Sequence, residues 1–426
     1  MRSTIENSTV ARGSVSQRSS GSSSSRTEAG QEQVAGRNGL AVSLLTGGGD
    51  RPYAFGIAAA LAASGTEIDV IGSDELDCPE LRAMPGVTFL NLRADQESGA
   101  SFEKKASRVL RYYACLIRYS ATAKPRIFHI LWNNRFEFFD RTLLMLYYKL
   151  LRKKIVLTLH NINKGKRDSQ DTHLNRLTLR FQYRLSDHIF VHTERMKREL
   201  IDEFGEQEAR VTIIPFGINN AVPRTSLSPS EARQRLGIRE GERTILFFGN
   251  IAPYKGLEYL VAAFQQLSAR HGDYRLIVAG RPKNCDEYWK PVLERMQDDI
   301  GSGRIILRAS FIPDEETEIY FRAADVTVLP YTHIYQSGVL LLGYSFGLPA
   351  IGTDVGSFRE DILEGRTGFL CRPADPADLE RAIETYFDSE LYNRLDEKRM
   401  EIAEYAHKRY SWETVAAATC SIYSGL

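Results

Sequence analysis

The sequence is poor in cysteine: its 426 residues include five, and none stands in a CxxC motif or a Cys/His pair. This spacing excludes a disulfide framework and a zinc site, and it favours a reduced compartment. No run of about 18 apolar residues is present to cross a bilayer. Ten of the first thirty residues are serine, and that stretch has no apolar segment, which argues against a signal peptide. We therefore expect a cytoplasmic protein, either soluble or peripheral at a membrane.

An excess of charge of either sign is also missing. The 55 Lys and Arg residues balance 54 Asp and Glu residues, for a net charge of +1, so the whole chain offers no argument for nucleic-acid binding. With 43% hydrophobic residues the chain can bury more than one core, because a single core stops growing near about 250–300 residues. Small stapled scaffolds, coiled coils and fully disordered chains are excluded.

Two runs of alternating apolar strands and helices follow a polar N-terminus. Residues 1–37 offer almost nothing apolar to offset the entropy of ordering, which predicts a disordered, Ser-rich tail. The first run covers 38–216, a turn-rich linker covers 217–230, the second run covers 231–395, and helices are expected over 396–426. This alternation predicts two doubly wound α/β domains with parallel sheets. Their ligand is expected in the cleft between them, outside the carboxyl ends of the strands.

Within these runs the helical pattern is clearest over Phe102–Thr122, Asp140–Arg152 and Pro376–Phe387. Short apolar runs over 155–160 and 244–249 predict buried strands. Each strand is followed by a loop and then by a helix, as in a βαβ unit.

Three loops could bind an anion. After the strand ending at Gly249 come Asn250 and then Lys255, which stands at the start of a helix. An ammonium and backbone N–H groups at that place match a phosphate oxygen, although a surface lysine capping a loop explains the spacing equally well. The turn Gln336-Ser337-Gly338-Val339 opens another helix, as an anion site or a simple N-cap. The third loop is Gly47-Gly48-Gly49 in the first half.

The order and spacing of these motifs resemble the retaining, nucleotide-sugar-dependent glycosyltransferases of family four. The resemblance runs from about Leu40 to the C-terminus. It implies the GT-B architecture of two facing Rossmann-like domains, with the last helix crossing back onto the N-terminal domain. Its anchors are Gly47–Gly49, Leu157–Asn161, Val211–Gly217, Gly249–Gly256, Leu276–Gly280, Gly347–Pro349, Thr353–Glu360, Gly365–Phe369 and Tyr410–Glu413.

The resemblance implies transfer of a mannose- or glucose-type hexose from a GDP- or UDP-linked donor, with retention of configuration. The acceptor is expected to be a glycan or a lipid-diphosphate-linked sugar in polysaccharide biosynthesis. No cofactor is expected, because the nucleotide sugar is a substrate. The sequence has no Asp-x-Asp, the usual metal-and-diphosphate clamp of the other large glycosyltransferase architecture, so we predict metal independence.

Two residues are assigned to catalysis by this resemblance. Lys255 is expected to stabilise the departing diphosphate electrostatically. His160 resembles the family histidine that contacts the donor sugar, whereas a lone histidine at a strand end is otherwise more often structural. Glu360 could bind sugar hydroxyls or cap the following helix. The predicted donor-binding residues are Gly48, Gly49, Asn250, Gln336, Ser337, Gly338, Val339 and Glu360.

The sequence departs from the family at three positions. Ile334 and Leu342 stand where the family commonly has a glutamate pair, and Asn250 stands where it often has an arginine. The second glutamate usually holds the nucleotide ribose. A branch with Gln336–Gly338 in place of the first glutamate would tolerate these changes. The alternatives are a catalytically silent GT-B subunit that binds glycan or activates a partner, and a sugar-nucleotide epimerase.

One stretch of the first half is strongly basic. Residues 103–184 contain nineteen Lys and Arg against five Asp and Glu, a local net charge of +14. Interleaved aromatic residues suit an anionic membrane surface, at about 1 kcal/mol for each nearby cation. A lipid-diphosphate acceptor or a plain solvated face explains the charge as well, and no motif indicates nucleic acid. The acceptor or membrane contacts are assigned to Lys149, Arg152, Lys153 and Lys154.

Overall fold

The computed structural model describes residues 39–95, 99, 101–167, 171–218, 222–283 and 285–426. The predicted disordered tail over 1–37 lies outside the described residues, as do positions 219–221 of the predicted linker. None of the described helices is both long enough and apolar enough to span a bilayer.

The first half of the chain builds a seven-stranded sheet in the order β3-β2-β1-β4-β5-β6-β7, with every pair parallel. Helices connect the strands, as the alternating pattern predicts. In chain order the elements are β1 (Ala41–Leu45), α1 (Arg51–Ala63), β2 (Glu67–Gly72), α2 (Pro79–Ala83), β3 (Val87–Asn91), α3 (Phe102–Thr122), β4 (Ile127–Ile130), α4 (Glu137–Arg141), α5 (Leu143–Leu150), β5 (Lys154–Thr158), α6 (Lys164–Arg167), α7 (His173–Leu185), β6 (His188–Val191), α8 (Glu194–Phe204) and β7 (Val211–Ile213).

The second half builds a six-stranded sheet in the order β10-β9-β8-β11-β12-β13, again entirely parallel. Two doubly wound α/β halves are therefore confirmed. Its elements are α9 (Pro229–Arg235), β8 (Arg243–Phe248), α10 (Leu257–Arg270), β9 (Tyr274–Ala279), α11 (Asp286–Gly301), β10 (Ile305–Arg308), α12 (Asp314–Ala323), β11 (Val326–Leu329), α13 (Gly338–Ser345), β12 (Ala350–Thr353), α14 (Phe358–Asp361), β13 (Gly368–Cys371), α15 (Pro376–Phe387), α16 (Glu390–Asn393), α17 (Leu395–Arg409) and α18 (Trp412–Ser424).

Each sheet has one point where the strand order reverses. In the first sheet β1 pairs with β2 on one side and β4 on the other, and in the second β8 pairs with β9 and β11. Ligands of such sheets bind outside the carboxyl ends of the strands at this switch point. The loop Gly47–Gly49 follows β1 and the loop with Lys255 follows β8, so both predicted ligand loops stand at switch points.

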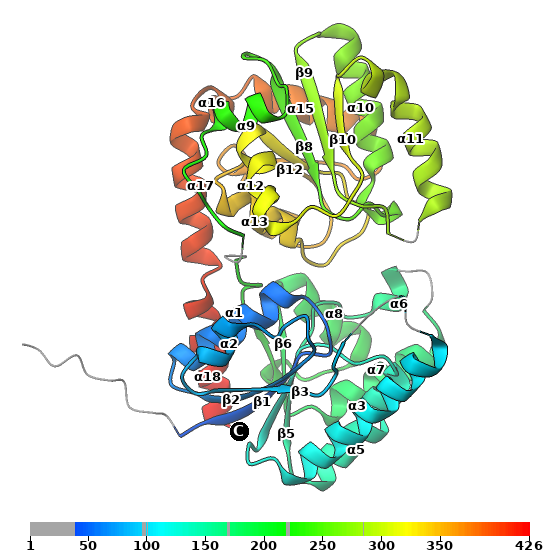
Figure 1. Cartoon of the computed structure of the whole chain (residues 1–426), viewed down its shortest axis with the longest axis vertical. Coiled ribbons are helices and arrows are strands. Elements are labelled where there is room, and N and C mark those ends of the chain that lie inside the picture. The colour runs from blue at the N-terminus through cyan, green and yellow to red at the C-terminus, as the bar shows by residue number, and fades with distance from the viewer. Residues whose placement is uncertain (1–38, 96–98, 100, 168–170, 219–221, 284) are drawn as a thin grey trace, which may run out of the picture. The chain divides into compact units, whose positions relative to one another are not determined.

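Two hydrophobic cores cover the two faces of the first sheet. One face packs on α3, α5 and α7 through buried residues such as Leu116, Tyr148 and Tyr183. The other face packs on α1, α2 and α18. Figure 1 shows α3, α5 and α7 running along one side of this sheet. Burial on both faces explains why successive residues of a strand can be apolar, as Ile189, Phe190 and Val191 of β6 are, instead of alternate ones.

The last helix of the chain, α18, packs against α1 in the first half. Its Trp412 ring lies 5.2 Å from the ring of Tyr53 on α1, and its Nε1 donates a hydrogen bond to the carbonyl of Ile218 at 2.9 Å. At the other end, Tyr423 Oη lies 2.6 Å from Nδ1 of His129, a fully buried residue of β4. Aromatic side chains thus hold both ends of α18 against the first half.

The predicted helix over Asp140–Arg152 is wrong as a single element. The chain has α4 and α5 there, separated at Thr142, whose φ of −121° and ψ of −86° are not helical. Asp140, at the end of α4, is 4% exposed and accepts a hydrogen bond from Tyr113 on α3 at 2.9 Å. The break at Thr142 thus follows a buried polar contact with another helix, and the apolar period does not record either feature.

Candidate active site

Lys255 is a buried cation. It ends the short 3-10 helix η2 (Pro253–Lys255) after β8, its side chain is 7% exposed, and its Nζ lies 5.3 Å from the centre of the Tyr331 ring. Burial lowers the pKa of this ammonium to about 8. No carboxylate among the described residues pairs with it, so the cost of burying the charge is not offset internally. A cation in this state is a ready partner for an anionic ligand.

Gly249 brings Lys255 next to the second predicted phosphate loop. Its φ is 95°, a region that favours glycine. A Cβ atom at this position would lie 3.1 Å from Lys255 Nζ and 3.3 Å from Cγ2 of Val339. The two loops therefore meet over the backbone of Gly249, which places the ammonium beside the start of α13.

Ser337 is the N-cap of α13. Its Oγ accepts a hydrogen bond from the amide of Leu340 at 3.2 Å. The amides of Gly338 and Val339 precede the first intrahelical hydrogen bonds, so they can donate to a ligand. Oε1 of Gln336 accepts a hydrogen bond from Ser357 at 3.3 Å, which holds the turn in place. The capping interpretation is correct, and it leaves the amides free to donate as well.

A cavity of about 180 Å³ lies at this helix start and is lined from both halves of the chain. Sites for drug-sized ligands usually measure about 300–1,000 Å³, so this cavity would hold one moiety of a nucleotide sugar. Leu342 lines it with an apolar side chain where the family has its ribose-binding glutamate. The lining residues are Asp50, Pro52, Tyr53, Phe216, Gly217, Gly338, Val339, Leu342 and Trp412.

Asp50 is the acidic residue of this lining, and no sequence pattern singled it out. It follows the glycine loop directly and caps α1, where its Oδ1 accepts a hydrogen bond from the amide of Tyr53 at 2.9 Å. Its place immediately after Gly49 is the signal that would have indicated it.

His160, which follows β5, lies in a cluster of aromatic rings. It stacks on Trp132 with ring centres 4.1 Å apart and an interplanar angle of 6°, and the edge of Tyr53 meets it at 4.6 Å. Gly49 is needed for this stack, because a Cβ atom there would lie 2.0 Å from the Trp132 ring. The predicted loop and the predicted histidine are therefore linked through a tryptophan that the sequence motifs did not single out. Tyr53, which lines the cavity, touches the same histidine.

The hydrogen-bond chain through His192 assigns the tautomer of His160. Nδ1 of His192 lies 3.1 Å from the carbonyl of Ile214, which can only accept, so Nδ1 carries a proton. Burial lowers the pKa of His192 to about 4, so its Nε2 is an unprotonated acceptor near neutral pH. Nδ1 of His160, 3.2 Å from that Nε2, must then donate.

The remaining nitrogen of His160 is an acceptor without a partner. Burial lowers the pKa of His160 well below its ordinary value, so the ring is neutral and its Nε2 has a lone pair. This atom is buried and has no hydrogen-bond partner among the described residues. Its chemistry suits a ligand hydroxyl better than an anion.

Three other predicted donor residues are placed differently. Asn250 is exposed beside Gly249. Gly48 lies against Arg93, whose Nη2 would be 2.7 Å from a Cβ atom at the glycine. Glu360 does not line the cavity: its carboxylate accepts hydrogen bonds from the amides of Glu194 and Arg195 at 3.2 and 3.4 Å. Glu360 therefore caps the N-terminus of α8 in the first half, and it does not cap the helix that follows Glu360 in the sequence.

The predicted acceptor or membrane cations have structural partners, with one exception. Lys153 is wrong as a surface residue: it is 8% exposed, and its Nζ donates to the carbonyls of Ala123 and Pro125 at 2.7 and 2.9 Å. Lys149 pairs with Asp187, and Lys154 Nζ lies 3.7 Å from the same carboxylate. Arg152 is exposed, and the Lys154 side chain is 45% exposed.

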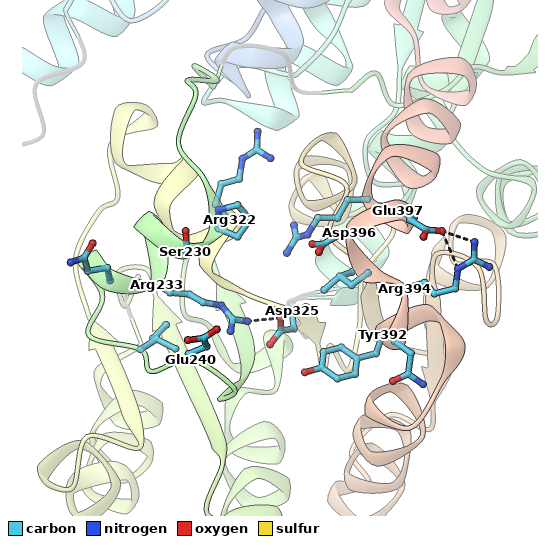
Figure 2. A pocket seen from close by; sticks show the side chains of 15 residues that line it. Ser230, Arg233, Glu240, Arg322, Asp325, Tyr392, Arg394, Asp396 and Glu397 are labelled. Carbon is cyan, nitrogen blue, oxygen red and sulfur yellow. Dashed lines mark hydrogen bonds and ion pairs between the residues drawn. The ribbon is translucent and has the colours of Figure 1, made fainter.

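A larger cavity, of about 850 Å³, lies at the amino ends of the strands of the second sheet (Figure 2). Asp325 directly precedes β11 and pairs there with Arg233 at 2.5 Å, and Arg394 pairs with Glu397. Four arginines and four carboxylates line this cavity, so their charges balance. It offers no excess charge for a diphosphate, and it is not the cavity at the carboxyl ends of the strands.

Comparison with known families agrees with this geometry. Residues 47–222 match the glycosyltransferase family 4 model, and residues 229–409 match the model of glycosyltransferases group 1. The D-inositol 3-phosphate glycosyltransferase of Acidothermus cellulolyticus is 24% identical over 389 residues, which covers 88% of this chain and 85% of that protein. The enzyme of the same name from Corynebacterium glutamicum is 24% identical over 392 residues, 88% and 91% of the two chains.

Solved structures show the same fold at low identity. Sucrose-phosphate synthase from Thermosynechococcus elongatus superposes with a TM-score of 0.72 at 18% identity, over 91% of this chain and 98% of that one. HepE of Anabaena, solved with UDP and glucose, has a TM-score of 0.70 at 16% identity, over 91% and 100%. The fold is GT-B, and the two family models together span both halves. The chain belongs to the GT-B glycosyltransferases of the family-four type.

Proposed function

We propose that this protein transfers a mannose- or glucose-type hexose from a UDP- or GDP-linked donor to a glycan or lipid-diphosphate-linked acceptor, with retention, in polysaccharide biosynthesis. The observation that carries this proposal is Lys255, a buried ammonium that pairs with no carboxylate in the described part of the chain and lies beside the free amides of α13. A sugar diphosphate supplies the missing negative charge. HepE, solved with UDP and glucose, shares the fold and supports the donor class.

In this mechanism the side chains act by position and charge. Breaking the bond between the anomeric carbon and the diphosphate leaves negative charge on the phosphate, which Lys255 and the amides of Gly338 and Val339 stabilise. Nε2 of His160 accepts a hydrogen bond from a hydroxyl of the donor sugar. The acceptor hydroxyl attacks from the face that the diphosphate leaves, and the departing phosphate takes its proton. No step requires a metal ion.

Thermal shift with UDP, GDP and ADP tests the donor site. We expect one of them to raise the melting temperature of the wild-type protein, and Lys255→Ala to abolish that shift. Lys290→Ala is the matched control, because Lys290 is an exposed lysine of α11 in the same half. A protein that none of the three stabilises has no working donor site, and the proposal then fails.

A silent, glycan-binding or partner-activating subunit is the second candidate, and Leu342 favours it. An apolar side chain there cannot accept hydrogen bonds from the ribose hydroxyls. Nucleotide binding without product would support the silent subunit. Release of an altered nucleotide sugar, with no acceptor consumed, would indicate the less favoured epimerase.

We also propose that the first half docks on the inner face of an anionic membrane, through its apolar layer on α3, α4, α5 and α7. Ten of the twelve exposed large hydrophobic side chains among the described residues lie there. The hydrogen bond from Tyr147 Oη to the carbonyl of Ile117 joins α5 to α3. The layer consists of Phe102, Leu110, Ile117, Phe136, Phe138, Leu143, Leu146, Leu150, Leu174 and Leu177.

Exposed cations among these apolar side chains indicate the kind of membrane. Arg111 and Arg118 are exposed on α3 next to Leu110 and Ile117, and neither pairs with a carboxylate of the described residues. Apolar side chains beside arginine suit a bilayer with anionic headgroups.

Flotation with phosphatidylglycerol vesicles tests the membrane contact. We expect Leu143→Ser/Leu150→Ser to weaken binding by about 10-fold or more, because two side chains that are 57% and 81% exposed lose their apolar burial in lipid. Met400→Ser is the control, since Met400 is 69% exposed on α17 in the other half. The proposal is contradicted if vesicle binding depends on neither anionic lipid nor salt. It is also contradicted if Leu143→Ser/Leu150→Ser leaves vesicle binding unchanged and only converts a dimer into a monomer.

A further inference from the structure

In a second cavity of the first half, all the charged lining residues are positive. It measures about 540 Å³ and lies between the start of α3, the loop after β4 and the glycine loop. Four of its lining residues are cationic and none is acidic. The lining residues are Gly47, Arg93, Phe102, Lys105, Ala106, Arg108, Val109, Tyr112, Tyr113, Asn134, Arg135 and Phe136.

Two of the four cations are held in place by neighbours. Arg93 lies over the Tyr112 ring at 5.2 Å and its Nη1 donates to Oδ1 of Asn134 at 3.3 Å. Nη1 of Arg108 lies 2.6 Å from Oδ1 of Asp95. Lys105 and Arg135 have no carboxylate partner among the described residues, so no described side chain neutralises their charge.

A buried polar network forms a stiff wall behind these cations. Tyr112 Oη donates to Oδ1 of Asn134 at 2.5 Å, and Asn134 Nδ2 donates to Oδ1 of Asp140 at 3.1 Å. Tyr113 Oη donates to the same carboxylate oxygen at 2.9 Å. Side chains that are already held lose little freedom when a ligand binds. The wall thus presents Arg93 to the cavity in one orientation.

The glycine loop connects this cavity with the one at the start of α13. Gly47 lines the basic cavity, and Asp50, three residues later, lines the cavity shared with Gly338 and Val339. Residues of one short loop, 47–50, therefore contribute to the walls of both cavities, and the basic cavity lies in the half to which the sequence assigns the acceptor.

We propose that this cavity binds the phosphate or diphosphate group of the acceptor, which makes the enzyme specific for anionic acceptors. The inference rests on the proposed function, and it names the substrate class at its acceptor end. Lys105 and Arg135 pair with the phosphate oxygens, while Arg93 orients the group. The aromatic side chains Tyr112 and Phe136 pack against the rest of the acceptor. A sugar phosphate and a lipid-linked sugar diphosphate share this chemistry.

The first test uses inorganic phosphate as the probe, with the stabilising nucleoside diphosphate of the thermal-shift panel, for example UDP, present in excess to fill the donor site. We expect phosphate to raise the melting temperature of the wild-type protein above that of a chloride control of equal ionic strength. Lys105→Ala/Arg135→Ala should lose this shift and keep the full shift caused by UDP. The matched control is Lys290→Ala/Arg295→Ala, a pair of exposed cations on α11. An equal phosphate shift in both double variants, or no shift in the wild type, overturns the inference.

Kinetics supply the second test and separate the two sources of phosphate. With a phosphorylated acceptor, Lys105→Ala/Arg135→Ala should raise the acceptor KM by about 10- to 100-fold with little change in kcat, as loss of uniform binding does. If the enzyme glycosylates a soluble sugar phosphate, the source is a free sugar phosphate. If it glycosylates only a lipid-linked sugar diphosphate in vesicles, the source is the lipid-linked acceptor. If Lys105→Ala/Arg135→Ala loses vesicle binding but keeps the wild-type phosphate shift, these two cations act at the membrane and not in the cavity, which contradicts the inference. If none of UDP, GDP and ADP raises the melting temperature, the proposed function fails separately, since the phosphate shift is still measurable.

Discussion

Lys255→Ala is expected to lower kcat/KM for the nucleotide sugar by about 10²–10³-fold, the cost of removing one preorganised donor to developing negative charge. The effect is large because the ammonium is buried beside the amides of α13, where water cannot replace it. Initial rates with a radiolabelled donor give the measurement. Lys290→Ala should retain the wild-type rate. A Lys255→Ala protein with full kcat/KM contradicts the electrostatic role.

The pH dependence of the same step follows from the lowered pKa of Lys255, about 8. Only the protonated amine stabilises the diphosphate, so kcat/KM, which reports the free enzyme, should fall as the pH rises through about 8. Bound diphosphate favours the charged form and should move the decline in kcat to higher pH. Lys255→Arg keeps its charge at these pH values, so any activity that it retains should lack this decline.

As the pH rises, the free energy of unfolding should increase, whereas activity should fall. The folded pKa of Lys255 lies below that of an unfolded lysine, so between the two values the unfolded state binds more protons and stability rises with pH. At pH 7 the buried charge costs stability, and Lys255→Met should melt no lower than the wild type in the absence of ligand. Loss of activity in a protein with this melting behaviour cannot be attributed to unfolding.

Trp412→Ala is expected to lower the free energy of unfolding by about 3 kcal/mol, in the range of large aromatic truncations. The ring packs against Tyr53 on α1 and fills the space beside Gly56 and Gly217, and its Nε1 satisfies the carbonyl of Ile218. Without it, α18 loses its N-terminal attachment to the first half. Urea unfolding followed by circular dichroism gives the measurement.

Two further variants show which property of Trp412 accounts for the loss of stability in Trp412→Ala. Trp412→Phe keeps an aromatic ring without the N–H group and should lose less stability than Trp412→Ala. Glu413→Ala changes the exposed neighbour on the same turn and should stay within about 0.5 kcal/mol of the wild type. If Trp412→Ala unfolds at the wild-type urea concentration, α18 is not held by this ring.

Local sequence patterns predict regular elements well in this chain where the helix is amphipathic and its ends are capped locally. The predicted helices Phe102–Thr122 and Pro376–Phe387 have the same bounds as α3 and α15. Ser101 and Asp375 cap their N-termini with their own side chains, so the start signals lie in the sequence itself. The predicted helix over 140–152 fails because the chain leaves the helical conformation at Thr142, next to a residue, Asp140, that is tied to another helix through Tyr113.

The features of the candidate site also fall into two groups, those that local sequence predicts and those that depend on distant contacts. The order of strands and glycine loops already indicates where Lys255, Ser337 and the Gly47–Gly49 loop stand, because a parallel sheet brings the carboxyl ends of its strands to one edge. What each side chain does there depends on partners distant in the chain. Lys153 cannot be recognised as buried without the carbonyls of Ala123 and Pro125.

By itself, the sequence determined the two α/β halves, the family and the loops that can bind a diphosphate, since these depend on residues close together in the chain. Contacts in the tertiary structure were needed to show that no carboxylate of the described ranges pairs with Lys255, that Nε2 of His160 is an acceptor, and that Glu360 caps α8. The tertiary structure also gathered Lys105 and Arg135 into one cavity without a carboxylate. These properties depend on contacts between residues far apart in sequence, and charge, burial and tautomer are set by those contacts.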